Sequence, residues 1–391
     1  MPAELRQFDV IVLGAGAAGL MCAATAGQRG RRVALLEHNG QAGRKILISG
    51  GGRCNFTNLH CGPGNFISDN PHFCKSALAL YEPGHFLELV ERYGIRWHEK
   101  TLGQLFCDGS AREILEMLLA ECELGGVELV LNAREIVVER GEGRFRVSCS
   151  AGEFAAEALV VACGGLSIEK MGATGLGYEL ARQFGLRVVT PRPGLVPLVL
   201  GGDEDRWTEL AGVSAEVVAS AGGVGFREKM LVTHKGVSGP AVLQASSYWR
   251  EGDELSVDFG PGRDLLGSLT RAGGRRDSGA MKQALGEVLP KRLAGFLVED
   301  GAPEGWSNAA LEACERRLHG WKLHPAGTEG FEKAEVTVGG VDTDGLQART
   351  MEARRVPGLF FIGEAVDVTG WLGGFNFQWA WASGVAAGRA V

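Results

Sequence analysis

Short apolar runs, each followed closely by a glycine or an acidic residue, recur along the chain and predict buried parallel strands. Residues 8–13, 33–36, 159–162 and 359–362 are largely apolar and lack the alternation of a half-exposed strand. An alanine-rich segment separates the first two runs and predicts a helix between two strands. A second helix rich in small residues is predicted near the C-terminus. The pattern therefore predicts an α/β protein.

The turn between the first strand and the first helix has the spacing Gly14-x-Gly16-x-x-Gly19. In a dinucleotide-binding turn the first glycine allows the tight turn, the second lets a pyrophosphate approach, and the third lets helix and strand pack closely. Glu37 ends the second strand, where a carboxylate can accept hydrogen bonds from ribose hydroxyls. The sequence predicts a dinucleotide site formed by Gly14, Ala15, Gly16, Ala17, Ala18, Gly19, Glu37 and His38.

Three later glycine-rich segments follow apolar runs and predict a cofactor longer than the first turn can hold. The segment GRKILISGGGRCNFTN places three glycines before an arginine, a cysteine and an asparagine, a composition that suits a large planar ring. Glu364 follows the last apolar run, where it can meet the ribityl hydroxyls of FAD, which NAD lacks. We therefore predict FAD. The additional residues predicted to bind it are Arg44, Lys45, Ser49, Gly50, Gly51, Gly52, Arg53, Cys54, Asn55, Cys163, Gly164, Gly165, Gly363, Glu364, Gly373, Gly374, Phe375, Asn376 and Phe377.

Composition narrows the class of protein. Forty basic against 47 acidic residues give a net charge of −7, and nucleic-acid binders usually carry a basic surplus. Nine cysteines stand singly, without a CxxC pair, which predicts a reducing compartment rather than disulfides or a zinc site. No apolar run has the length of a membrane span. These observations predict a cytoplasmic protein without a nucleic-acid or membrane partner and without a metal; they do not address the oligomeric state.

Four segments together resemble a bacterial flavoprotein family with aminoacetone-oxidase-like and dehydro-bile-acid-reductase-like members. They are GRKILISGGGRCNFTN, CGGLSIEKMGATGLGYELA, THKGVSGPAVLQAS and GEAVDVTGWLGGFNFQWAWASG. The resemblance implies a Rossmann-like FAD-binding domain formed by both chain ends, at 1–190 and 335–391. It also implies an inserted region, which we divide into a small antiparallel β domain at 191–262 and a helical subdomain at 263–330.

The residues that carry the chemistry are less clear from the sequence than the cofactor. FAD itself performs hydride transfer, and no hydrolase or metal motif competes with this interpretation. His234 and Lys235 lie in a glycine-punctuated loop and are candidates for proton transfer, although a solvated loop is an equal alternative, so the catalytic residues stay unknown. Cys54 has no cysteine partner nearby, which disfavours thiol–disulfide chemistry.

The function expected from the sequence is an FAD-dependent oxidoreductase acting on a small organic metabolite. Either NAD(P)H reduces the flavin or oxygen reoxidises it, and the sequence does not separate these two versions. A second nucleotide-binding glycine motif is absent from the sequence, so NAD(P)H would bind only transiently. The alternative is a flavin-bound redox sensor without small-molecule turnover.

Overall fold

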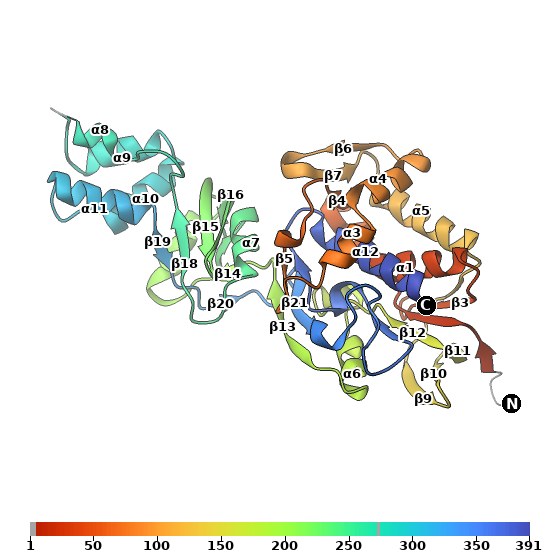
Figure 1. Ribbon diagram of the computed structural model, residues 1–391. Coiled ribbons are helices and arrows are strands. Elements are labelled where there is room, and N and C mark those ends of the chain that lie inside the picture. The colour runs from red at the N-terminus through yellow and green to blue at the C-terminus, as the bar shows by residue number, and fades with distance from the viewer. Residues whose placement is uncertain (1–4, 272–273) are drawn as a thin grey trace. The chain divides into compact units, whose positions relative to one another are not determined.

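The protein forms two compact units in the computed structural model, which describes residues 5–271 and 274–391 (Figure 1). The first unit joins Met1–Arg192 to Val336–Val391, and the second is Pro193–Glu335. The chain leaves the first unit along β13 (Val188–Gly194) and returns along β21 (Val336–Val341), and these two strands pair with each other. The second unit is therefore an insertion in a domain that both chain ends build.

A five-stranded parallel sheet lies at the centre of the first unit. Its order is β22 (Leu359–Phe361), β12 (Ala158–Val161), β2 (Val10–Leu13), β3 (Val33–Leu36) and β8 (Glu128–Val130). Every residue of the first four strands is buried, which explains why their sequences do not alternate. The predicted Rossmann-like α/β fold is confirmed. The fifth strand was not predicted, because its three residues are partly exposed and form no apolar run.

Helices and smaller sheets surround this parallel sheet. The helices are α1 (Ala17–Gln28), α2 (Arg44–Ile48), α3 (Lys75–Leu80), α4 (Pro83–Arg92), α5 (Ala111–Leu124), α6 (Leu176–Gln183) and α12 (Phe375–Ala390). The smaller sheets are β4 (Asn55–Asn58) with β7 (Gln104–Cys107) and β6 (Trp97–Glu99); β1 (Leu5–Gln7) with β11 (Gly152–Ala156), β10 (Arg144–Cys149) and β9 (Val137–Gly141); and β5 (Phe66–Ile67) with β23 (Thr369–Gly370).

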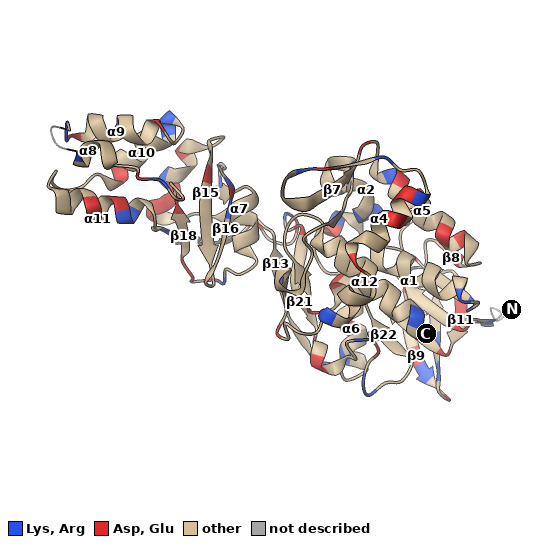
Figure 2. Cartoon of the chain, turned by 45° about the horizontal axis from the view of Figure 1, so that its top comes forward, with Lys and Arg blue, Asp and Glu red and all other residues tan. Residues whose placement is uncertain are grey.

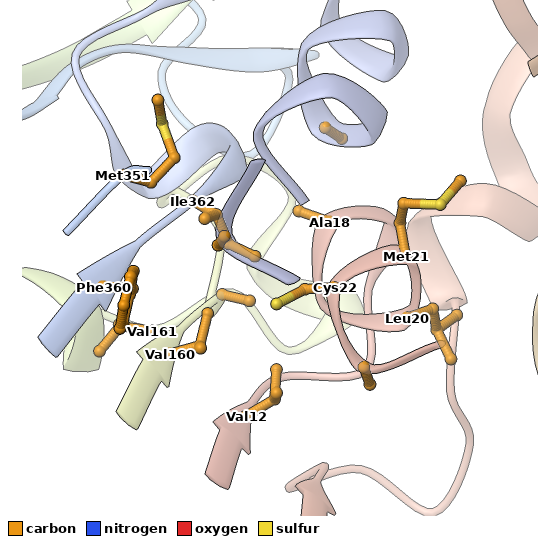
Figure 3. Packing of buried hydrophobic residues seen from close by; sticks show 14 of the residues in the cluster. Val12, Ala18, Leu20, Met21, Cys22, Val160, Val161, Met351, Phe360 and Ile362 are labelled. Atoms are coloured by element: carbon orange, nitrogen blue, oxygen red, sulfur yellow. The ribbon is translucent and has the colours of Figure 1, made fainter. Parts of the chain in front are cut away.

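The first and last helices, α1 and α12, pack against each other at unusually short range. A Cβ atom added at Gly384 would lie 2.7 Å from the carbonyl oxygen of Ala18, and one at Gly388 would lie 2.7 Å from that of Cys22. Figure 3 shows Ala18 and Cys22 in the same buried cluster as Ile362, which follows β22. Small residues therefore bring the N-terminal dinucleotide turn and the C-terminal segment into one core.

The second unit combines an antiparallel sheet with helices. The sheet order is β19 (Trp321–Leu323), β18 (Leu255–Asp258), β15 (Ser214–Ala221), β16 (Val224–Val232), β17 (Gly236–Ser238), β14 (Leu198–Val199) and β20 (Gly327–Thr328). The helices are α7 (Pro240–Ser246), α8 (Gly267–Thr270), α9 (Ser278–Gly286), α10 (Lys291–Gly301) and α11 (Asn308–Leu318). Two strands, β19 and β20, fall inside 263–330, which the sequence assigns to helices. These two strands are too short to show the alternation of apolar and polar residues that is typical of a strand.

Two further observations concern the cysteines and membrane-spanning helices. All nine cysteines are free thiols. Within residues 5–271 and 274–391, no helix has both the length and the apolar character needed to cross a bilayer.

Candidate functional site

The turn after β2 has the shape of a dinucleotide cradle. A Cβ at Gly14 would lie 2.6 Å from the carbonyl oxygen of Ala162, and one at Gly19 would lie 1.8 Å from the carbonyl oxygen of Gly14. Both glycines are therefore required by packing. Gly16 is different, because no described residue other than its two chain neighbours lies within 4 Å of a Cβ built there. The open space at the N-terminus of α1 suits a pyrophosphate, which binds to free N–H groups and the positive helix end.

The carboxylate of Glu37 lies at the end of β3 and closes this cradle. Glu37 is only 6% exposed. One carboxylate oxygen accepts a hydrogen bond from the backbone N–H of Ala15 at 2.9 Å, and the other accepts from the backbone and side-chain N–H groups of Asn39. His38 Nδ1 lies 3.2 Å from the same carboxylate. Arg44 donates to Asn39 Oδ1 at 2.8 Å, so these predicted residues form one network.

The triple glycine after α2 forms a tight turn that only glycine adopts easily. Gly50, Gly51 and Gly52 have φ angles of 56°, 66° and 84°. No described atom lies within 4 Å of a Cβ at Gly51 or Gly52, which leaves room for a planar group. Arg53 is exposed beside them, whereas Cys54 is fully buried.

The thiol of Cys54 is poorly suited to chemistry. Burial raises its pKa to about 12, so it stays protonated at neutral pH.

A partly buried ion pair joins the N-terminal and C-terminal parts of the chain. Lys45 Nζ lies 2.8 Å from Glu364 Oε2, and Ser167 and the backbone N–H of Thr337 donate to Glu364 Oε1 at 2.8 and 2.9 Å. Burial alone would raise the pKa of Glu364, but the ammonium of Lys45 and these hydrogen bonds outweigh it and lower the pKa. Ser167 and Thr337 were not predicted, because nothing in their local sequence marks them. Gly165 lies against Thr337, where a Cβ would be 2.4 Å from its hydroxyl.

The N-terminus of α12 meets the strand β4. A Cβ at Gly374 would lie 2.4 Å from the carbonyl oxygen of Thr57, and one at Gly373 would lie 3.0 Å from the amide carbon of Gln104. The side-chain amides of Asn55 and Gln104 are in hydrogen-bond contact at 3.0 Å. Sequence reasoning missed Gln104 and Asn58, since the strand β7 is only four residues long and β4 was not identified as a strand.

The other predicted positions lie around these groups. Gly363 N–H donates to Ser383, Asn376 donates to the backbone of residues 370 and 371, and Phe375 packs edge-on against Phe66. The remaining predicted positions in the first unit are Ala17 and Ala18 in α1, Ser49 before the triple glycine, Cys163 and Gly164 after β12, and Phe377 in α12.

His234 and Lys235 belong to the second unit, in the loop between β16 and β17. Both are exposed, and Lys235 Nζ already pairs with Glu329 at 3.0 Å. Their role in proton transfer stays a hypothesis. Among the described residues, no cluster of three or more His, Cys, Asp or Glu side chains could hold a metal ion.

Comparison with known proteins shows the family to which the chain belongs. The HI0933-like protein Rossmann domain matches residues 8–390. The chain is 49% identical to a ribosomal RNA dihydrouridine synthase of Escherichia coli K12 over 98% of both chains, and 43% identical to one of Haemophilus influenzae over 99% of both. It is 30% identical to a 3-dehydro-bile acid delta(4,6)-reductase of Clostridium scindens, over 97% of this chain and 98% of the relative.

Two solved structures share the fold at low identity. They are Mycobacterium smegmatis Sdh1 (19% identity, TM-score 0.52, 99% of this chain and 68% of that chain) and the Rhodococcus jostii RHA1 3-ketosteroid-delta4-(5alpha)-dehydrogenase (15% identity, TM-score 0.50, 98% of both chains).

The names of the relatives overturn one expectation. Two of them are ribosomal RNA dihydrouridine synthases, so the exclusion of a nucleic-acid partner from net charge is wrong. Acidic and basic residues are interspersed, for example along α11 (Figure 2), and a total over the chain does not describe a local surface. The family resemblance and the FAD cofactor expected from the sequence are both confirmed, and the chain belongs to the HI0933-like Rossmann family of FAD-dependent oxidoreductases.

Proposed function

We propose that this protein reduces a uridine of ribosomal RNA to dihydrouridine, with FAD as its redox cofactor. The observation that carries the proposal is the 49% identity over 98% of both chains to a ribosomal RNA dihydrouridine synthase. On this ground we propose ribosomal RNA as the substrate in place of the small metabolite expected from the sequence. Small-molecule reduction is the second candidate, favoured by the more distant bile-acid reductase.

The open glycine positions fit FAD, and each part of the site has a task in holding it. The Gly14–Gly19 turn and the N-terminus of α1 would bind the pyrophosphate, and Glu37 would bind the adenosine ribose. The Lys45–Glu364 pair would lie along the ribityl chain. The Gly50–Gly52 turn and the start of α12 would border the flavin ring. The space beside Gly16, Gly51 and Gly52 supports this assignment, because no described residue other than their chain neighbours lies within 4 Å of a Cβ built at any of the three.

The direction of the reaction also follows from chemistry. When bound and reduced by NAD(P)H, FAD would supply a hydride to C6 of uracil, whose C5–C6 double bond is conjugated with the C4 carbonyl, and C5 would take a proton. The helix α12 is 16 residues long, and its positive N-terminal end would stabilise negative charge on the reduced cofactor. Both kinds of relative are named for reductions, which favours NAD(P)H as the reductant over oxygen as an acceptor.

The proposal is tested on ribosomal RNA from cells that lack this protein. The RNA is incubated with the FAD-loaded protein and NADH or NADPH, digested to nucleosides and analysed by mass spectrometry. Dihydrouridine, heavier than uridine by two hydrogens, should appear only when protein, FAD and reductant are all present. Protein stripped of FAD is the control. Reduction of the flavin by NAD(P)H without any dihydrouridine would contradict an RNA substrate and favour a small molecule.

A further inference from the structure

The hairpin turn between β6 and β7 carries an exposed leucine in an unfavourable conformation. Lys100 N–H donates to the carbonyl oxygen of Gln104 at 2.8 Å, which closes the hairpin. Two of the three residues in the loop, Leu102 and Gly103, have φ angles of +61° and +74°. Positive φ favours glycine or asparagine, whereas a bulky residue there is strained. Leu102 is also 61% exposed, so burial does not compensate for the strain.

The turn is held firmly beside the cofactor site. Asn58, which is 1% exposed, donates to the carbonyl oxygens of both Leu102 and Gly373, at 3.1 and 2.9 Å. Leu59 N–H donates to the carbonyl oxygen of Gly103 at 2.9 Å. One buried amide therefore ties the tip of the hairpin to the glycines that precede α12. A strained residue that its surroundings hold in place is typical of functional sites.

The surface around this tip combines apolar and cationic groups, with the acidic residues Glu99 and Asp108 exposed on the same hairpin. Leu59 is 44% exposed, and Lys100 is exposed with its ammonium 5.2 Å from the ring centre of Phe106. Arg53 and Arg96 are exposed at the other end of the same three-stranded sheet, where their carbonyl oxygens accept from the N–H groups of residues 107 and 108. Cations suit RNA phosphates, and exposed leucines suit the faces of bases.

We propose that Leu102 is a wedge that takes the stacking position of the target uridine when that base turns out of the RNA toward the cofactor site. Lys100 contacts the flanking phosphates. The proposal rests on the proposed function, because an enzyme that acts on the ring of a base within folded RNA must first remove the base from its stack. Apolar side chains that insert between bases are an established means of opening a stack. A rigid turn holds such a side chain better than a mobile loop.

Two variants remove the wedge and keep the turn. Leu102→Gly and Leu102→Asn introduce residues that accept positive φ, so both proteins should fold with an unchanged or raised Tm. The matched control is Leu124→Asn, because Leu124 is another exposed leucine, at the end of α5. FAD content and the rate of flavin reduction by NAD(P)H are measured in every variant.

The expected result is a fall of about tenfold or more in kcat/KM for dihydrouridine formation in folded ribosomal RNA for both Leu102 variants, which is about 1.4 kcal/mol of lost transition-state stabilisation. The Leu124 control should match the wild type, and flavin reduction should be unchanged throughout. On a short unpaired oligonucleotide containing uridine, the deficit should disappear, because no stack has to be opened.

Two results overturn the wedge alone. One is a kcat/KM of Leu102→Asn within twofold of the wild type on folded RNA. The other is an equal deficit on the unpaired oligonucleotide, which would assign Leu102 a general contact instead. If the wild type forms dihydrouridine in neither RNA, the proposed function itself fails and the wedge falls with it.

Discussion

The Gly14–Gly19 turn contains two kinds of glycine. Gly16 leaves room for the ligand, whereas Gly19 is required by the packing of the fold. Gly16 has φ −82° and ψ −170°, which alanine also adopts, and no described atom lies within 4 Å of the added Cβ. In Gly16→Ala, the smaller entropy of the unfolded chain stabilises by about 0.4–1 kcal/mol, and the poorer helix N-cap offsets part of this. The free energy of unfolding of the apoprotein should therefore change by less than about 0.5 kcal/mol.

The same methyl group should weaken FAD binding strongly. It would occupy the approach of the pyrophosphate, and a lost hydrogen bond to a charged group costs about 1.5–3 kcal/mol. The Kd for FAD should rise by about 10- to 150-fold. The assay is a titration of the apoprotein with FAD, followed by the flavin fluorescence, together with denaturant unfolding of the apoprotein.

Gly19→Ala is the matched comparison, since its Cβ would lie 1.8 Å from the backbone oxygen of Gly14, which cannot rotate away. Overpacking of this kind costs about 1–3 kcal/mol or more, against a gain of about 0.5–1 kcal/mol for alanine in a helix. A net loss of about 2 kcal/mol lowers the Tm of the apoprotein by about 4–8 °C. Gly16→Ala protein that binds FAD as tightly as the wild type would refute the assignment of this turn to the pyrophosphate.

Three further changes test individual side chains. Burial opposes the charge of Glu364, but Lys45 and hydrogen bonds lower the pKa of its carboxyl group below 4.5. The charged carboxylate therefore stabilises the folded protein above pH 4.5, and this stability is lost as the pH falls through the pKa of the folded state. Glu364→Gln should flatten the acid side of a curve of Tm against pH. Burial raises the pKa of Asp367 to about 6, because the folded protein favours the neutral carboxyl group. The contribution of this neutral group to the free energy of unfolding is lost as the pH rises through 6. Asp367→Asn should stabilise by about 2–3 kcal/mol at pH 8 and hardly at pH 4, and an equal change at both values would contradict this. Cys54 is 0% exposed with a pKa of about 12, so iodoacetamide at pH 8 should leave it unlabelled by mass spectrometry and Cys54→Ala should retain turnover.

The parts of the site whose residues lie close together in the sequence were predictable from it. The turn from Gly14 to Gly19 leads directly from the buried strand β2 into α1, and all of the residues that define it are close together in the sequence. Lys45 and Glu364 were each predicted to bind FAD, but their contact joins residues 319 positions apart, so no local pattern reveals it.

The three-stranded sheet β4–β7–β6 escaped prediction for a physical reason. Its strands have three or four residues, and the register between β4 and β7 shifts after Asn55. The sequence therefore shows no alternation of apolar and polar residues there. Gln104 and Leu102 belong to this sheet and its turn, and neither carries a signal in a single sequence. The expectation of no nucleic-acid partner failed because net charge averages over the whole chain. Arg53, Arg96 and Lys100 flank the strands of this one sheet, although acidic residues outnumber basic ones in the chain as a whole.

A single-turnover experiment tests the central claim most directly. The FAD-loaded protein is reduced with one equivalent of NADPH or NADH without oxygen and mixed with excess ribosomal RNA from cells that lack the protein. We expect the absorbance of oxidised flavin to return, with one dihydrouridine formed for each flavin reoxidised. Flavin that stays reduced in the presence of this RNA, with no dihydrouridine by mass spectrometry, would contradict the account.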